Sequence, residues 1–179
     1  MATKTRRDDR GIWKRALWLV PLIVVLGSLS GIVSNSGYAN GWFAGLQKPS
    51  FMPPGWAFGA AWTALYTMLA LALATVLNEP RSKERTTAVT LFVTQLVLNY
   101  LWSPVFFGLH DIKLASALLF AILLVSAITA GKFWRLRPLA GALMLPYLAW
   151  LTFASVLNHA IDTLNPGAGE SLLVKLAGG

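Results

Sequence analysis

Tryptophan, tyrosine and amide side chains recur at helical spacing in three apolar stretches of the sequence, and residues of these types can recognise a ligand. Spacings of four, seven and eleven residues place side chains on one face of a helix. The side chains that share such faces are Trp62 and Tyr66 in one stretch, Gln95, Asn99, Trp102 and Phe106 in a second, and Pro146, Trp150, Ala154, Leu157 and Asn158 in a third. Aromatic walls with a few directed amide groups are typical of a binding site for a flat, hydrophobic ligand.

Residues that carry covalent or metal chemistry are scarce. The chain has no cysteine, which excludes disulfides, thiolate catalysis and iron–sulfur clusters. Its two histidines, His110 and His159, have no cysteine or carboxylate companion, so we predict interface histidines and no metal site. No Ser-His-Asp arrangement and no phosphate-binding glycine loop is recognisable.

The elements that position the aromatic stripes are predicted to be membrane-spanning helices. Of the 179 residues, 56% are hydrophobic and 12% are charged, which is too apolar for an ordinary soluble domain. Each uncharged run is long enough to cross a bilayer, for which about 20 helical residues suffice. The runs are residues 16–34, 55–77, 87–107, 114–131 and 139–160. The sequence therefore predicts an all-α bundle of five transmembrane helices.

The first run also has features of a secretory signal, but its apolar part is longer than usual, which favours a retained helix. None of the runs contains a charged residue, which argues against ion- or proton-coupled transport. We divide the chain into a basic cytoplasmic tail (1–15), a transmembrane domain (16–165) and a short flexible tail (166–179).

Lysine and arginine alternate between the connections and predict the orientation. The N-terminal tail has six, and the loops at 78–86 and 132–138 have three each, whereas each alternate segment has one. This bias places the N-terminus inside and the C-terminus outside a bacterial cell membrane. The net charge of +8 is then explained by membrane topology and does not indicate nucleic-acid binding.

The outer connection between the first two runs, residues 35–54, is predicted to be an ordered lid. It carries Trp42 and three prolines, among them Pro53, which restrict its backbone. Simpler interpretations remain open. Trp42 and Trp56 are also suited to an aromatic belt, and Gln95 and Asn99 can join helices by hydrogen bonds.

Three motifs carry a resemblance to a known family. "WFAGLQKPSFMPPGWAFGAAWTALY", "QLVLNYLWSPVFFG" and "LPYLAWLTFASVLNH" resemble the TspO/MBR family of tryptophan-rich sensory proteins, which includes the mitochondrial translocator proteins. The resemblance implies a five-helix membrane bundle, commonly homodimeric, whose pocket binds porphyrins and often sterols or isoquinoline-type ligands under the first loop. It also leaves the mitochondrial outer membrane open as a location.

Carried over by position, the resemblance assigns lid and pocket residues. The lid receives Trp42, Lys48, Pro49, Pro53 and Pro54, and the pocket receives Trp62, Asn99, Trp102, Trp150, Ala154 and Leu157. The helical stripe adds Tyr66. In some bacterial relatives to which the resemblance extends, the tryptophans matching Trp62 and Trp150 are implicated in light-dependent porphyrin breakdown, so that activity stays open here. We expect these two to face one another across the ligand site, with a porphyrin between or beside them.

Two departures limit the resemblance. His159 and Thr163 replace the tyrosine and basic residue of the sterol motif, and Leu114 stands where many relatives have a pocket tryptophan. The leading expectation is a receptor or sensor that binds a tetrapyrrole, porphyrin or haem, in the outer half of the bundle and needs no cofactor. A light-dependent porphyrin-degrading enzyme and a passive carrier of porphyrins or sterols are the alternatives.

Overall fold

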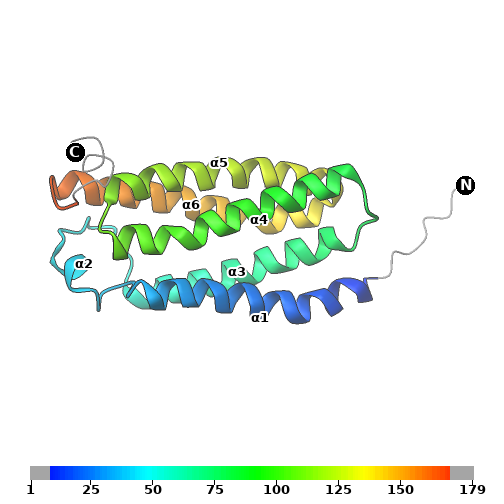
Figure 1. Cartoon of the computed structure of the whole chain (residues 1–179), viewed down its shortest axis with the longest axis horizontal. Coiled ribbons are helices and arrows are strands. Elements are labelled where there is room, and N and C mark those ends of the chain that lie inside the picture. Colours follow the sequence, from blue (N-terminus) through cyan, green and yellow to red (C-terminus); the bar gives the residue numbers. More distant parts are fainter. Residues whose placement is uncertain (1–8, 170–179) are drawn as a thin grey trace, which may run out of the picture.

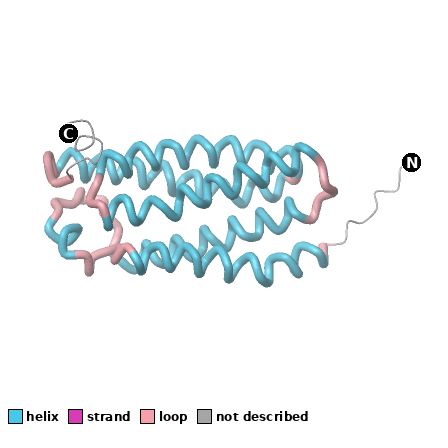
Figure 2. Tube along the Cα trace, viewed as in Figure 1, coloured by secondary structure: helices cyan, strands magenta, loops and turns pink. Residues whose placement is uncertain are grey.

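Five long helices run side by side along one axis, and a short helix, α2, lies beyond their ends on one side (Figure 1). The computed structural model describes residues 9–169. Its elements are α1 (Arg10–Val33), α2 (Gly41–Gly45), α3 (Gly55–Leu77), α4 (Lys83–Ser103), the π-helix η1 (Pro104–Gly108), α5 (Ile112–Leu136) and α6 (Pro138–Leu164). All regular structure in this range is helical, as Figure 2 shows. The five long helices are long and apolar enough to cross a membrane, so the predicted fold class is confirmed.

The helices differ from the uncharged runs mainly at the basic ends. The second run coincides with α3, but α1 begins at Arg10 and not at residue 16, and α5 continues to Leu136. The runs were bounded by charge, whereas lysine and arginine are good helix formers whose long side chains reach past the hydrocarbon. Of the tail predicted at 166–179, residues 170–179 lie outside the described residues.

Capping side chains and prolines explain where several helices begin. The Ser82 hydroxyl accepts a hydrogen bond from the Arg85 backbone N–H at the start of α4. The Asp111 carboxylate caps α5 in the same way. Arg137 alone separates α5 from α6, and its extended backbone is what a residue before proline adopts. The chain therefore reverses direction within one residue.

The helices pack in the order α1, α3, α6, α5, α4, with α4 also contacting α1. Gln95 of α4 lies fully buried in the core and accepts hydrogen bonds from Ser126 of α5 at 3.1 Å and from Tyr147 of α6 at 2.8 Å. The amide thus joins three helices. For Gln95, the interpretation as a packing residue is the one that the contacts support.

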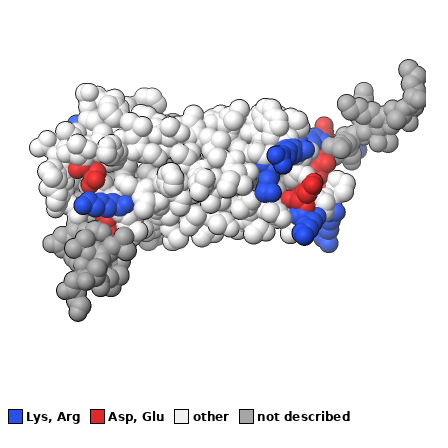
Figure 3. Space-filling view, turned by 90° about the horizontal axis from the view of Figure 1, so that it is seen from above, with Lys and Arg blue, Asp and Glu red and all other residues white. Residues whose placement is uncertain are grey.

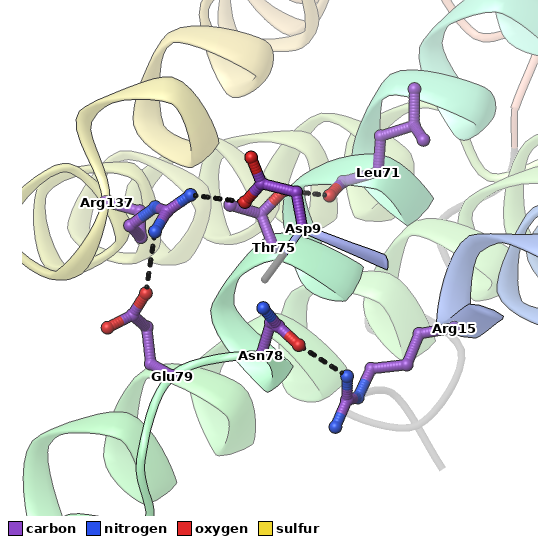
Figure 4. A network of polar contacts seen from close by, with 7 residues as sticks. All are labelled: Asp9, Arg15, Leu71, Thr75, Asn78, Glu79 and Arg137. Carbon is purple, nitrogen blue, oxygen red and sulfur yellow. Dashed lines mark hydrogen bonds and ion pairs between the residues drawn. The ribbon is translucent and has the colours of Figure 1, made fainter. Parts of the chain in front are cut away.

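Basic side chains gather at the end of the bundle opposite α2, where α1 begins and the α3–α4 and α5–α6 connections lie (Figure 1, Figure 3). Within this end, the Arg137 guanidinium lies 3.1 Å from Glu79 and 3.5 Å from Asp9, and Arg15 donates to the Asn78 side chain at 2.7 Å (Figure 4). These contacts tie the first residues of α1 to the end of α3 and to the α5–α6 connection.

Candidate functional site

A cavity of about 630 Å³ lies at the α2 end of the bundle. Its wall comes from α1 and the turn after it, from α3, from α4 with η1, from Leu119 of α5 and from α6, with α2 and its flanking loop above. The volume falls within the range of about 300–1,000 Å³ that is usual for small-molecule sites. The structure thus contains a space of ligand size where the sequence placed the aromatic stripes.

Most of the residues expected in the pocket lie on the wall of this cavity. They are Trp62, Tyr66, Asn99, Trp102, Trp150, Ala154 and Leu157. Two expected ligand-binding residues, Trp42 and Pro53, are not on the wall. The cavity brings together side chains from three helices that are far apart in sequence.

Trp42 points away from the cavity because of how α2 begins. The Asn40 side chain accepts a hydrogen bond from the Phe43 backbone N–H, which caps α2 and leaves Phe43 buried on the cavity side. The Trp42 indole instead stacks on His110 at 4.4 Å and donates to the Ala168 carbonyl at 3.1 Å. Phe43 therefore occupies the position that the sequence analysis gave to Trp42.

The roof of the cavity is formed by α2 and its flanking loop. The Pro53 carbonyl belongs to this roof and accepts a hydrogen bond from the Tyr38 hydroxyl at 3.0 Å. Lys48 holds the same loop. Its ammonium donates to the carbonyls of Phe43 at 2.7 Å and Leu46 at 3.0 Å, and it lies 4.7 Å from the centre of the Phe43 ring. A cation at the end of a helix satisfies carbonyls that have no partner within the helix. The first loop is thus held by specific contacts as well as by its prolines.

Trp62 and Trp150 touch each other on the cavity wall. Their ring centres are 6.3 Å apart and their planes are inclined at 81°, an edge-to-face contact. A flat ligand sandwiched between two rings needs parallel planes about 7 Å apart, because carbon atoms pack at about 3.5 Å. The two indoles therefore leave no room for a ligand between them, and of the two expected arrangements only a ligand beside the pair fits this geometry.

Two buried polar atoms of the wall have no hydrogen-bond partner within residues 9–169. They are the Trp102 indole N–H and the Asn158 side-chain oxygen. The Asn158 amide nitrogen donates to the Ile112 carbonyl at 3.2 Å and to the Ser116 hydroxyl at 2.6 Å. Because a carbonyl can only accept, these contacts identify the remaining side-chain atom as the oxygen. The wall residues thus include one buried donor and one buried acceptor without a partner within residues 9–169.

The side-chain amide of Asn99 also lies on the wall, but its oxygen already has a hydrogen-bond partner. Its oxygen accepts a hydrogen bond from the Tyr66 hydroxyl at 2.8 Å. This contact joins α4 to α3 on the wall itself, so Asn99 both lines the cavity and holds its shape. Among residues 9–169 there is no group of three or more histidine, cysteine or carboxylate side chains that could hold a metal ion.

Several wall residues were not predicted from the sequence. Phe58 precedes Trp62 by four residues, so the helical spacing was a usable signal. Gly27 and Gly31 also lie on the wall. Gly27 packs closely, because a Cβ atom there would overlap the Tyr66 ring, whereas Gly31 has only Ser36 near its Cβ position.

Comparison with known proteins places the whole membrane domain in one family. A family model described as the TspO/MBR family matches residues 19–164. The tryptophan-rich protein TspO of Archaeoglobus fulgidus is 41% identical over 69% of this chain and 80% of its own length. The translocator protein of Sus scrofa is 36% identical over 84% of this chain and 92% of its own length.

A third relative, the tryptophan-rich sensory protein of Cereibacter sphaeroides, is 39% identical over 69% of this chain and 77% of its own length. The family match includes residues of all five long helices, and it confirms the resemblance that the three motifs carry. The chain therefore belongs to the TspO/MBR family of multi-pass membrane proteins.

Proposed function

We propose that this membrane protein is a receptor or sensor that binds a tetrapyrrole, porphyrin or haem, in the cavity beneath α2. The observation that carries the proposal is the composition of the wall: aromatic rings on several sides, with one free donor at Trp102 and one free acceptor at Asn158. A tetrapyrrole is flat and largely apolar and carries carboxylates that accept hydrogen bonds. Its protonated carboxyl or pyrrole N–H groups can donate to the amide oxygen.

We further propose that the cavity lies in the outer half of the membrane. Nine of the described lysine and arginine residues lie at the opposite end of the bundle, against Lys48 and Lys113 at the cavity end. Such an excess marks the cytoplasmic side. The N-terminus would then be inside, and the cavity would face the periplasm or the space outside.

The proposal is tested by titrating the purified protein with protoporphyrin, haem and a sterol while tryptophan fluorescence is recorded. We expect saturable, stoichiometric quenching by a tetrapyrrole, because six of the wall's aromatic side chains lie in contact clusters around the cavity: Phe58, Trp62, Tyr66, Trp102, Phe106 and Trp150. The sterol should compete weakly or not at all. Failure of both tetrapyrroles to saturate the signal would overturn the proposal.

A second function, light-dependent breakdown of the bound porphyrin, is favoured by the contact between Trp62 and Trp150. One electron passing from an indole to the photoexcited porphyrin would leave an indole radical cation and a porphyrin radical anion, and molecular oxygen would be the oxidant for ring opening. Bleaching of the bound porphyrin under light supports the enzyme. Binding without bleaching supports the receptor, and porphyrin flux into protein-containing vesicles supports a carrier.

A further inference from the structure

The exposed residues of the cavity wall all lie on one side of it. Among the wall residues, those of α4, η1, α5 and α6 are buried or half-buried. The exposed ones belong to α1, to the turn after it, or to the first turns of α3, and include Ser28, Ile32, Gly59 and Thr63. The cavity is therefore open between α1 and α3.

The other sides are closed by specific contacts. On the α4 side, Ser30 donates to the Tyr100 carbonyl, and the Tyr100 hydroxyl donates to the Ile23 carbonyl at 2.9 Å. On the α6 side, the ring of Trp150 lies 6.3 Å from Trp62. A ligand cannot pass there without breaking helix contacts.

Hydrogen bonds to η1 and to the end of α6 hold the roof in place. The Asn40 side chain donates to the Phe107 carbonyl at 3.2 Å, which ties α2 to η1. Asn165 accepts from the Gln47 backbone N–H at 2.7 Å and donates to the Gln47 carbonyl at 2.8 Å, which ties the loop to the end of α6. Opening the roof would break several hydrogen bonds at once.

Glycines account for the gap between α1 and α3. The two helices touch at Gly27, against the Tyr66 ring. One turn after Gly27 on α1, a Cβ atom at Gly31 would meet only Ser36, at 3.7 Å. On α3, a Cβ atom at Gly59 would meet nothing within 4 Å. The helices lie apart beyond Gly27, and the absence of side chains on the facing glycines leaves the space clear.

The gap faces the membrane. Thr63 lies eight residues after the start of α3, or about 12 Å along the helix axis, so the gap reaches into the hydrocarbon of one leaflet. Large apolar side chains are exposed on both helices, since Ile32 of the wall is 72% exposed and Trp56, in the first turn of α3, is 76% exposed. Among the wall residues, Asn158 is 3% exposed and its side-chain oxygen has no hydrogen-bond partner within residues 9–169, so the wall keeps an unused acceptor.

We propose that the ligand enters and leaves this cavity sideways from the lipid bilayer, through the gap between α1 and α3 lined by Gly31, Gly59 and Thr63. The inference rests on the proposed function for the identity of its ligand, a porphyrin dissolved in the outer leaflet. The first loop is then a fixed roof, and the glycine-lined gap sets the rate of exchange.

The test uses the full chain in phospholipid vesicles that contain protoporphyrin, with tryptophan quenching followed by stopped flow. Gly59→Ala and Gly59→Leu place side chains of increasing size in the gap, where nothing lies within 4 Å of the Cβ position. We expect Gly59→Leu to slow both association and dissociation by about tenfold or more, with Gly59→Ala between it and the parent.

The matched control is Gly131→Leu, because Gly131 is also an exposed helical glycine with nothing within 4 Å of its Cβ position, but it lies on α5 away from the cavity. It should exchange porphyrin at the parent rate. A double variant that loosens the roof, Pro53→Gly with Pro54→Gly, should also keep the parent rates.

Three results would overturn the lateral route. They are unchanged rates in Gly59→Leu, a Kd that shifts in step with one rate constant, and faster release from the loosened roof. If the parent protein shows no saturable porphyrin binding, the proposed function fails and the route for this ligand fails with it. If binding is intact and only the rates disagree, the lateral route alone is wrong.

Discussion

Replacing Trp102 by phenylalanine should separate ligand binding from folding. The indole stacks on Phe106, with ring centres 5.0 Å apart and planes inclined at 16°, and phenylalanine can keep that stacking. What the change removes is the buried N–H that has no partner within residues 9–169. A buried donor without a partner costs about 1–3 kcal/mol of stability, whereas the smaller ring loses packing of similar size.

The free energy of unfolding of the Trp102→Phe protein without ligand should therefore change by no more than about 1 kcal/mol, a shift of roughly 2–4 °C in the thermal midpoint. Binding should respond differently, because a hydrogen bond to a charged acceptor such as a carboxylate contributes about 1.5–3 kcal/mol. By affinity arithmetic, the Kd for protoporphyrin should rise by roughly 10- to 150-fold.

The assay pairs fluorescence titration with thermal unfolding in detergent. Trp134→Phe is the control, since Trp134 is 49% exposed and lies near the end of α5, away from the cavity. An unchanged Kd in Trp102→Phe, with the control also unchanged, would refute the assignment of the free indole N–H to the ligand. A large fall in the thermal midpoint would show that the indole supports the fold and not the ligand.

Three further predictions concern the basic end, the photochemistry and the topology. Glu79→Gln should lower the free energy of unfolding by about 1–3 kcal/mol, because the nearly buried carboxylate pairs with a half-buried arginine. Asp9→Asn should lower it by less than about 1 kcal/mol, because the Asp9 side chain is 64% exposed. Thermal unfolding of both variants measures the difference. Trp150→Phe should reduce the rate of light-dependent bleaching of bound porphyrin by a larger factor than it raises the Kd for porphyrin. Equal bleaching rates in variant and parent would show that Trp150 has no photochemical role. Accessibility tags at positions 48 and 83 should be labelled from opposite sides of the membrane, and labelling from one side would contradict the orientation.

The sequence predicted the helices well because charge inside a membrane is costly, so uncharged runs mark spans without any knowledge of packing. It also predicted which faces turn inward, since unpaired amides such as Asn99 cannot face lipid. It did not separate Gln95 from Asn99. Both lie on one helical face four residues apart, but their roles depend on partners in other helices.

The loop was harder to predict for a local reason. Trp42 and Phe43 are neighbours, and which of them faces the cavity is decided by the Asn40 cap that sets the rotation of α2. In the same way, helical spacing placed Trp62 and Trp150 at similar depths, but only the distance between α3 and α6 determines whether the rings touch or leave room for a ligand.

The connection between α5 and α6 bears on how the protein enters its membrane. Arg137 is the only residue between the two helices, and Pro138 follows it at the first position of α6. Two apolar segments joined so tightly cannot be released one at a time with a loop held between them. We therefore expect α5 and α6 to leave the translocation machinery as one helical hairpin. Their pairing would precede the closing of the cavity, which needs α1 and α3 from the first half of the chain.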